Sequence, residues 1–265
     1  MYELLKQKIS LELNNENKIN KLREYLQIFI LKIIFDRGFF SNVAFVGGTA
    51  LRVLYGMRRY SEDIDFSLIN KRNYNFKTFL EQIVFELTKN NFKVATNNKK
   101  NKTINSSFIK FPSLLHELGL SKIRSQILSI KLEIDTNPPN GWNLVLTPVT
   151  ETFVFAVNSF DLPSLYATKL HACFFRRYIK GRDFYDLIWY LGKKIEPNYV
   201  LLNNAIKQTE KEDLNINSNN FKHFIGDKLK KINFKLVCKD VERFLEDKNE
   251  LKLLNREIIL KMILT

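Results

Sequence analysis

The chain has 265 residues, 45% hydrophobic and 13% aromatic, which is enough to bury a core in one large or two small domains. No apolar run is long enough to span a membrane, because Lys32 and Asp36 interrupt the longest candidate, and the N-terminus lacks the features of a secretory signal. Two distant cysteines, Cys173 and Cys238, do not suggest a disulfide framework, so we expect a protein of the reducing cytoplasm. The formal net charge of +14 favours a polyanionic partner.

The first part of the chain predicts helices, followed by a short strand and turn. Two amphipathic helices are expected around Asn15-Glu16-Asn17, the second ending near Phe35. Between about Val43 and Leu68 the pattern then indicates a strand, a turn, a helix and a second strand. This last stretch carries the most informative residues of the chain.

Asp63 and Asp65 lie at alternate positions of the second of these strands. Side chains alternate across a strand, so the two carboxylates share one face, while Ile64 and Phe66 point into the core. Two carboxylates this close repel each other unless a cation lies between them. The usual cation is a divalent ion such as Mg²⁺ or Mn²⁺.

Gly47 and Gly48 precede the helix between the two strands. Without a Cβ atom, their backbone N–H groups can approach phosphate oxygens, and the positive N-terminal end of the helix points the same way. The hydroxyl of Thr49 can cap this helix or contact the phosphate. Alone, a glycine pair is often only a tight turn and two alternating aspartates only a solvated face. In this order, they predict a nucleoside triphosphate held beside metal ions.

The next elements are a helix and a pair of strands. Apolar residues at helical spacing predict a helix from Phe76 to Asn90. Alternating runs at Phe92 to Ala95 and Thr103 to Phe111 predict antiparallel strands, with their turn at Asn97 to Lys102.

A further strand from Ile127 to Asp135 carries candidates for a third acid. Its alternation places Lys131, Glu133 and Asp135 on one face. A two-metal site normally needs a third carboxylate on a neighbouring strand. Both Glu133 and Asp135 qualify, although Asp135 precedes a Pro-Pro-Asn-Gly turn, where a polar residue can also close a loop.

The second half of the chain is predicted to be helical. Pro163 favours a first helical turn, with Ser159 or Asp161 as the cap. Along this helix, Lys169 and Arg176 fall on the same side.

Gly181 is expected to end this helix and to separate it from another. That second helix carries Asp183 and Asp186 one turn apart. Helical patterns then continue from Pro197 to Thr265, and a last helix is predicted from Leu251 to Leu264.

Two stretches of the chain resemble the AbiEii/AbiGii nucleotidyltransferase toxins. These include the MenT-like toxins of type IV toxin–antitoxin systems and belong to the polymerase-β-like nucleotidyltransferase superfamily. The stretches are GGTALRVLYG followed by RYSEDIDFSL, and LPSLYATKLHACFFRRYIKGRDFYDLIWYL from Leu162 to Leu191. The resemblance implies an α+β fold with a mixed sheet flanked by helices and a helical C-terminal half. It places a nucleotidyltransferase core at 1–157 and a helical domain, which completes the nucleotide site, at 158–265.

The resemblance also implies roles for the matching residues. Glu133, in the setting IKLEI, best matches the third acid of the family, Lys169 is expected to contact the triphosphate, and Asp183 or Asp186 either holds that lysine or contacts the nucleotide. The implied catalytic residues are Asp63, Asp65, Glu133, Lys169 and Asp183. The implied nucleotide-binding residues are Gly47, Gly48, Thr49, Arg52, Ser61, Lys169 and Asp186. The implied metal ligands are Asp63, Asp65 and Glu133, with Asp135 as the alternative third acid.

The implied reaction is the transfer of nucleotides from a nucleoside triphosphate to the 3′ end of tRNA, with release of pyrophosphate. This would block aminoacylation and translation, with tRNA and a cognate antitoxin as partners and no membrane involved. Two alternatives stay open, namely the same chemistry on a small-molecule or protein acceptor, and a non-catalytic nucleic-acid-binding module with the same fold. The positive charge agrees with an RNA acceptor, and the intact acids argue against a non-catalytic module.

Overall fold

The computed structural model describes residues 5–7, 9, 14–100 and 103–264. The helix predicted before Asn15 lies largely outside these residues, as do residues 101 and 102 of the predicted turn. The described residues form two compact units. The first comprises the described residues up to Gly56, Tyr60–Asn137 and Leu146–Ser159, and the second comprises Met57–Arg59, Pro138–Val145 and the chain from Phe160 onward. The chain therefore passes between the units several times, whereas the sequence predicted two contiguous domains.

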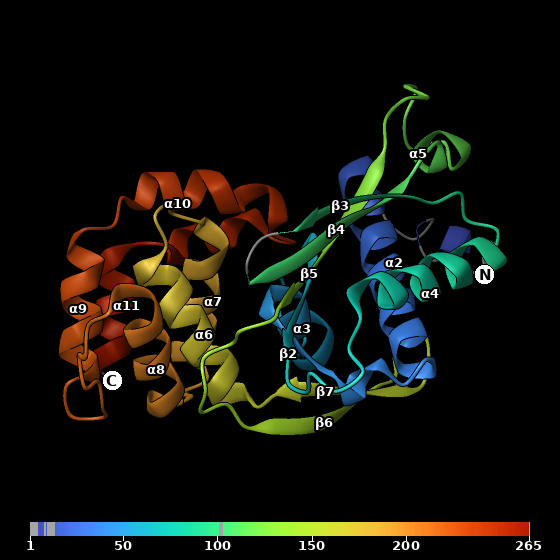
Figure 1. Cartoon of the computed structure of the whole chain (residues 1–265). Helices are drawn as coiled ribbons and strands as arrows, with labels where there is room; N and C mark the ends of the chain where they lie inside the picture. Colours follow the sequence, from blue (N-terminus) through green and yellow to red (C-terminus); the bar gives the residue numbers. More distant parts are fainter. Residues whose placement is uncertain (1–4, 8, 10–13, 101–102, 265) are drawn as a thin grey trace. The chain divides into compact units, whose positions relative to one another are not determined.

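The strands form one seven-stranded mixed sheet in the order β3-β4-β5-β2-β1-β7-β6 (Figure 1). They are β1 (Val43–Val46), β2 (Asp63–Leu68), β3 (Ala95–Lys100), β4 (Ile104–Phe111), β5 (Leu128–Asp135), β6 (Leu144–Val149) and β7 (Phe155–Phe160). Strand β2 is central, antiparallel to β1 and parallel to β5, while β3, β4 and β5 run antiparallel. The mixed sheet with its helices confirms the predicted α+β class.

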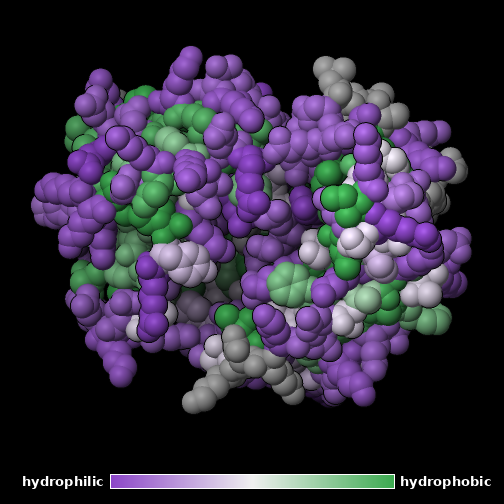
Figure 2. All heavy atoms as spheres, turned by 90° about the horizontal axis from the view of Figure 1, so that it is seen from above, coloured by the Kyte–Doolittle hydropathy of each residue, from purple (hydrophilic) through white to green (hydrophobic). Residues whose placement is uncertain are grey.

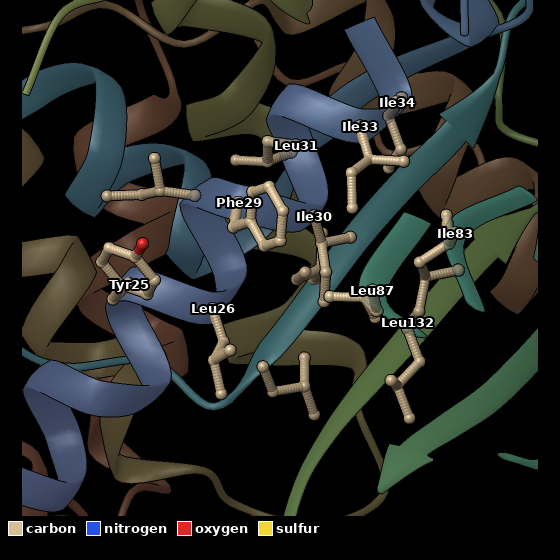
Figure 3. Close-up of a cluster of buried hydrophobic side chains, with 14 of the residues drawn as sticks. Tyr25, Leu26, Phe29, Ile30, Leu31, Ile33, Ile34, Ile83, Leu87 and Leu132 are labelled. Carbon is tan, nitrogen blue, oxygen red and sulfur yellow. The ribbon is translucent and has the colours of Figure 1, made fainter. Parts of the chain in front are cut away.

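Helices cover the sheet of the first unit and bury its main core. They are α2 (Asn15–Asp36), the 3₁₀ helix η1 (Phe39–Ser41), α3 (Gly47–Tyr55), α4 (Phe76–Lys89) and α5 (Leu114–Glu117). Figure 3 shows α2 presenting Phe29 and Ile30 toward Ile83 and Leu87 of α4, beside Leu132 of β5. All five side chains belong to one buried apolar cluster, which fixes the sheet against these helices.

The structure corrects the predicted position of the first strand in the β3–β4 hairpin. The prediction placed the strand at Phe92–Ala95 and the turn at Asn97–Lys102, whereas β3 occupies Ala95–Lys100 and pairs with β4. Phe92 lies before the strand, buried against Phe29 and Phe111. Strand β3 is at the edge of the sheet, where polar residues and lysines are tolerated, so its composition resembles that of a turn.

The second unit is a helical assembly. Its helices are α6 (Leu162–Phe175), α7 (Gly181–Gly192), α8 (Tyr199–Glu210), α9 (Phe221–Lys230), α10 (Phe234–Val241) and α11 (Arg256–Leu264), with 3₁₀ helices η2 (Glu242–Phe244) and η3 (Lys248–Leu253). Tyr166 and Tyr190 stack in its core with ring centroids 4.2 Å apart, and Phe221 meets Tyr166 edge-on. Among the described residues, no helix combines the length and apolarity needed to cross a lipid bilayer.

Two helix boundaries of the second unit test the sequence predictions. Asp161 caps α6 by accepting the Ser164 N–H at 2.9 Å, which confirms one of the two predicted caps, whereas Ser159 lies in β7. The continuous helix predicted from Leu251 to Leu264 is wrong. The chain leaves helical structure after η3, and the Asn255 side chain accepts the Ile258 N–H at the start of α11.

Candidate active site

The start of α3 lies directly against Asp65. Gly47 follows β1 with a φ of 81°, and a Cβ atom at this position would lie 2.3 Å from Oδ2 of Asp65. Only glycine tolerates both the left-handed backbone and this approach. The glycine therefore brings the N-terminal end of a helix, which favours negative charge, up to a candidate metal ligand.

The predicted alternation in β2 is confirmed. Ile64 and Phe66 are buried in the main core, and Asp63 and Asp65 lie on the opposite face with partial exposure. Strand pairing then extends this acidic face to β5, because parallel register places Glu133 opposite Asp65.

Lys131 lies among these three carboxylates. It is opposite Asp63 in the register, and its Nζ is 2.8 Å from Oε1 of Glu133. Burial alone would lower the pKa of Lys131, but the hydrogen bond and charge of Glu133, together with the charges of Asp63 and Asp65, raise this pKa above its ordinary value. The acidic face thus contains its own cation, which the sequence prediction did not include among the site residues.

Asp135 has a different environment from Glu133. It lies opposite Ser67, beyond the two aspartates, and its Oδ1 accepts the Asn137 N–H at 2.9 Å. Burial raises the pKa of Asp135, and the Asn137 N–H partly offsets this effect. The Asp135 side chain therefore closes the turn after β5, as a polar residue before a Pro-Pro-Asn-Gly turn can do.

The acidic face has the ligand types that a divalent cation prefers, but it does not form a complete set of metal ligands. Carboxylate oxygens are the ligands that Mg²⁺ and Mn²⁺ prefer, and Asp63 and Asp65 supply them on one face. However, no group of three or more His, Cys, Asp or Glu side chains in the described part of the chain is arranged to hold a metal ion. Glu133 is paired with Lys131 and does not complete such a group.

Buried side chains fix the backbone that leads into β2. The Thr49 hydroxyl donates to the carbonyl of Asp63, and Gln27 Nε2 donates to the carbonyls of Ser61 and Asp63 at 3.1 and 3.3 Å. The helix cap predicted for Thr49 is absent, because Val46 occupies the N-cap position without a side-chain bond. Thr49 and Ser61 are almost fully buried. Thr49 and Gln27 therefore hold the backbone of the aspartate strand from its buried side.

Arg52 is also engaged within the first unit. Its guanidinium forms an ion pair with Glu24 and stacks over Tyr60, 4.2 Å from the ring centroid. Burial alone would raise the pKa of Glu24, but Arg52 outweighs this effect and holds the pKa below its ordinary value. These contacts tie α3 to α2, which gives Arg52 a structural part in placing the helix.

The second unit contains a separate buried charge cluster around Lys169. Its Nζ lies 3.0 Å from Oδ1 of Asp183 and 2.9 Å from Oδ2 of Asp186. Arg59 donates two bonds of 2.6 Å to Asp186, and Arg176 donates one of 2.6 Å to Asp183. Both carboxylates are almost completely buried, and each of them pairs with two cations of the cluster.

The cluster keeps Lys169 charged. Burial alone would lower the pKa of Lys169, but Asp186 and Asp183 raise it above its ordinary value. Burial would likewise raise the pKa of Asp183, but Lys169 and Arg176 hold it below the usual range. An ammonium has three N–H groups, and two are directed at the carboxylates. The third can donate to a phosphate oxygen.

Arg59 is the residue that sequence reasoning missed. Arg58 and Arg59 are adjacent cations shortly before the two aspartates in the sequence. In the structure, Arg59 is 1% exposed and pairs with Asp186, 127 residues away, whereas Arg58 is exposed beside Glu250. The sequence pattern around Arg58 and Arg59 does not indicate which of the two arginines is buried.

The connection between α6 and α7 departs from the prediction. Helix α6 ends at Phe175, and Arg176 has an extended backbone, so the chain leaves the helix before Gly181. Gly181 begins α7, and its N–H donates to Asp240 of α10 at 2.7 Å. A Cβ atom on Gly181 would lie 2.1 Å from the carbonyl oxygen of Val237, so this glycine allows the close packing of α7 on α10.

His171 and Cys173 are packing residues. The His171 ring stacks on Phe175 and its Nε2 lies 2.8 Å from the Thr209 hydroxyl. Cys173 donates its S–H to the carbonyl of Asp183, and burial raises the pKa of its thiol well above the ordinary value. Both cysteines of the chain are free.

Comparison with known proteins relates this arrangement to nucleotidyltransferases. The model of a family described as "Nucleotidyl transferase AbiEii toxin, Type IV TA system" matches residues 30–256. The solved structure of JHP933 from Helicobacter pylori matches at 19% identity with a TM-score of 0.54, over 91% of this chain and 90% of that chain. A structure described as a "putative nucleotidyltransferase from H. pylori" matches at 19% identity with a TM-score of 0.53, over 89% of this chain and 92% of that chain. At this identity, the two structures show the fold alone. No curated protein sequence matches the chain.

Proposed function

Because the chain belongs to the AbiEii family of nucleotidyltransferase toxins of type IV toxin–antitoxin systems, we propose that it transfers nucleotides from a nucleoside triphosphate to the 3′ end of tRNA. This transfer would block translation in the cytoplasm, and an antitoxin would counter it. The main support is the face of β2, which Asp63 and Asp65 share: Asp65 lies against Gly47, and Glu133 of β5 is in register with Asp65. The positive charge of the chain supports an RNA acceptor.

The proposed roles follow from the positions of the side chains. Asp63 and Asp65 hold Mg²⁺ or Mn²⁺, with Glu133 as the third carboxylate once Lys131 releases it. When bound, the metal would neutralise the triphosphate and lower the pKa of the attacking hydroxyl. The backbone N–H groups of Gly47 and Gly48 are oriented by α3 to meet phosphate oxygens.

Lys169 is proposed to neutralise charge on the triphosphate, as the family resemblance implies. Its charged form is maintained by Asp183 and Asp186, and its third N–H group is the one that meets the phosphate. In the transfer itself, the acceptor hydroxyl oxygen forms a bond to the α-phosphorus. The bond from that phosphorus to the bridging oxygen breaks, pyrophosphate leaves and the hydroxyl proton passes to solvent.

The first experiment removes the charge of the aspartates without changing their shape. Purified Asp63→Asn and Asp65→Asn proteins are incubated with each labelled nucleoside triphosphate, Mg²⁺ and total bacterial RNA. Loss of a direct metal ligand is expected to reduce transfer by at least about 100-fold. The matched control is Asp227→Asn, which removes an exposed carboxylate on α9. Transfer at the wild-type rate by either aspartate variant would disprove the proposed site.

The same experiment separates the acceptor classes. Label in tRNA-sized RNA with the wild-type protein, but not with Asp63→Asn, would support the RNA acceptor and identify the nucleotide. Absence of label in any RNA, while the triphosphate still binds in a metal-dependent way, would favour a small-molecule or protein acceptor.

A further inference from the structure

The second unit contains a cationic pocket that the site described above does not use. The pocket has a volume of about 650 Å³ and is lined by Arg177, Ile179, Leu236, Lys239, Asp240 and Arg243. Three cations thus face one carboxylate, and that carboxylate already accepts the N–H of Gly181 at 2.7 Å. The volume lies in the range of pockets that hold a nucleotide-sized group.

The cations of this pocket are not all used by the fold. Among the described residues, neither the Arg177 side chain nor the Lys239 side chain has a hydrogen-bond or ion-pair partner, and both are exposed. Arg59 and Arg176, by contrast, are paired with aspartates of the Lys169 cluster. Exposed cations without protein partners are available to bind phosphates.

An apolar side chain lines the pocket, and an exposed aromatic ring lies between two of the lining residues in sequence. Tyr178, next to Arg177, is 60% exposed, and its ring has Arg176 at 5.5 Å and Lys180 at 5.8 Å. Leu236 in the pocket wall is 54% exposed. Figure 2 looks onto the side of the second unit that carries α10 and shows hydrophobic patches enclosed by hydrophilic surface. An exposed aromatic ring between cations is the usual platform on which an unpaired base stacks.

Residues of the pocket adjoin the Lys169 cluster, both in sequence and through the packing of α7 on α10. Arg176 donates to Asp183, which holds Lys169, and Arg177 and Tyr178 follow directly in sequence. On the other side, Gly181 begins α7 against α10, which supplies Lys239. The pocket is therefore fixed relative to the lysine that we assign to the triphosphate.

We infer that this pocket binds a single-stranded end of the acceptor RNA, with Arg177 and Lys239 on phosphates and Tyr178 stacked on a base. The inference rests on the proposed function, because only transfer to RNA requires the protein to bind an acceptor strand. Duplex RNA would not fit the same role, because its bases are paired and cannot stack on a side chain. The pocket is thus expected to prefer single strands to duplexes.

The test measures RNA binding separately from catalysis. A labelled single-stranded RNA oligonucleotide and a duplex of the same length are titrated with the full-length protein, without nucleotide, and followed by fluorescence anisotropy. The double variant Arg177→Gln/Lys239→Gln is compared with Lys222→Gln/Lys235→Gln, which removes the same charge from exposed positions of α9 and α10 outside the pocket.

The pocket variant is expected to bind the single strand at least about tenfold more weakly than the control variant at low salt. Two lost phosphate contacts should also reduce the slope of log affinity against log salt by about 1.4, since each contact on a single strand contributes about 0.7. Tyr178→Ala is expected to weaken single-strand binding by at least about fivefold while changing duplex binding little.

The result that overturns the inference is equal affinity and equal salt slope for the pocket and control variants. Metal-dependent binding of the nucleoside triphosphate is measured in parallel and should be unchanged in both. If the wild-type protein transfers no nucleotide to RNA and yet the pocket variants lose RNA binding, the proposed function fails while the pocket assignment stands. If transfer occurs but the pocket variants bind RNA normally, the proposed function stands and the pocket assignment fails.

Discussion

Gly47 shows how one missing Cβ atom shapes the acidic face of β2. Its φ of 81° is in the left-handed region, and its backbone lies against Asp65. Gly56, at the other end of α3, has a φ of 67° but no heavy atom within 4 Å of its Cβ position. The same helix therefore offers one glycine needed for conformation alone and one needed for both conformation and close approach.

Alanine at the two positions should separate these requirements. Gly56→Ala is expected to destabilise the protein by about 1–2 kcal/mol through left-handed strain and to leave nucleotide transfer intact. Gly47→Ala carries the same strain, but the added Cβ would also displace the Asp65 carboxylate, so it should lower the unfolding temperature further and largely abolish transfer. Thermal unfolding and the labelled-nucleotide assay measure the two effects. Equal loss of activity in both variants would contradict the role of the close approach.

The sequence alone indicated the aspartates and glycines of the candidate site, but not the ion pairs that form around them. Asp63, Asp65 and Gly47 belong to a local motif, so their spacing determines their relation. The pairing of Arg59 with Asp186 and the burial of Arg52 against Glu24 depend on long-range packing. Such contacts have no local signature, and sequence reasoning could name the residues at most as cations near a motif.

At the scale of elements, the pairing of β2 with β5 determines which charges meet. Parallel register places Lys131 opposite Asp63 and Glu133 opposite Asp65. The Lys131 ammonium is therefore a competitor for the position that a divalent cation would take among the carboxylates. Its ion pair with Glu133 is partly exposed, so its contribution to the free energy is modest.

Removal of this ammonium should strengthen metal binding. Lys131→Met is expected to bind Mn²⁺ about two- to tenfold more tightly than the wild-type protein, because Glu133 loses its partner and the local positive charge disappears. Electron paramagnetic resonance of free Mn²⁺ measures this affinity without any reaction. Lys77→Met, which removes an exposed lysine of α4, is the control for net charge. Unchanged Mn²⁺ binding in Lys131→Met would contradict the competition, and weaker binding would show that the lysine supports the site.

Elements with a strong local pattern were predictable, and those determined by their neighbours were not. The order β1, α3, β2 and the strand β5 followed from alternation and glycine positions. The position of β3 was predicted wrongly because its Asn and Lys residues resemble a turn. Such residues are tolerated at the edge of a sheet. The interruption before α11 was missed because apolar spacing continues through Leu254, although Asn255 caps a new helix.

At the scale of the whole molecule, the two units are not contiguous in sequence. Met57–Arg59 and Pro138–Val145 belong to the helical unit, although both segments precede the predicted boundary at residue 158. Each contributes polar contacts there. Arg59 binds Asp186, and the carbonyl of Gly141 accepts Nδ2 of Asn198 at 2.7 Å. The helical unit therefore depends on residues that a cut at the predicted boundary would remove.

A fragment comprising 160–265 is accordingly expected to be much less stable than the same unit in the full chain. Without Arg59, the carboxylate of Asp186 stays buried with Lys169 as its remaining partner, and breaking a buried pair by loss of one partner costs about 3–5 kcal/mol. Far-ultraviolet circular dichroism with urea unfolding measures this loss.

Asp186→Asn in the fragment should recover part of the stability, because it removes the charge that Arg59 no longer balances. In the full chain, the same substitution should destabilise, since Arg59 is then the group left buried without its partner. A fragment that unfolds at the same urea concentration with and without Asp186→Asn would show that the Arg59 contact does not determine the stability of the helical unit.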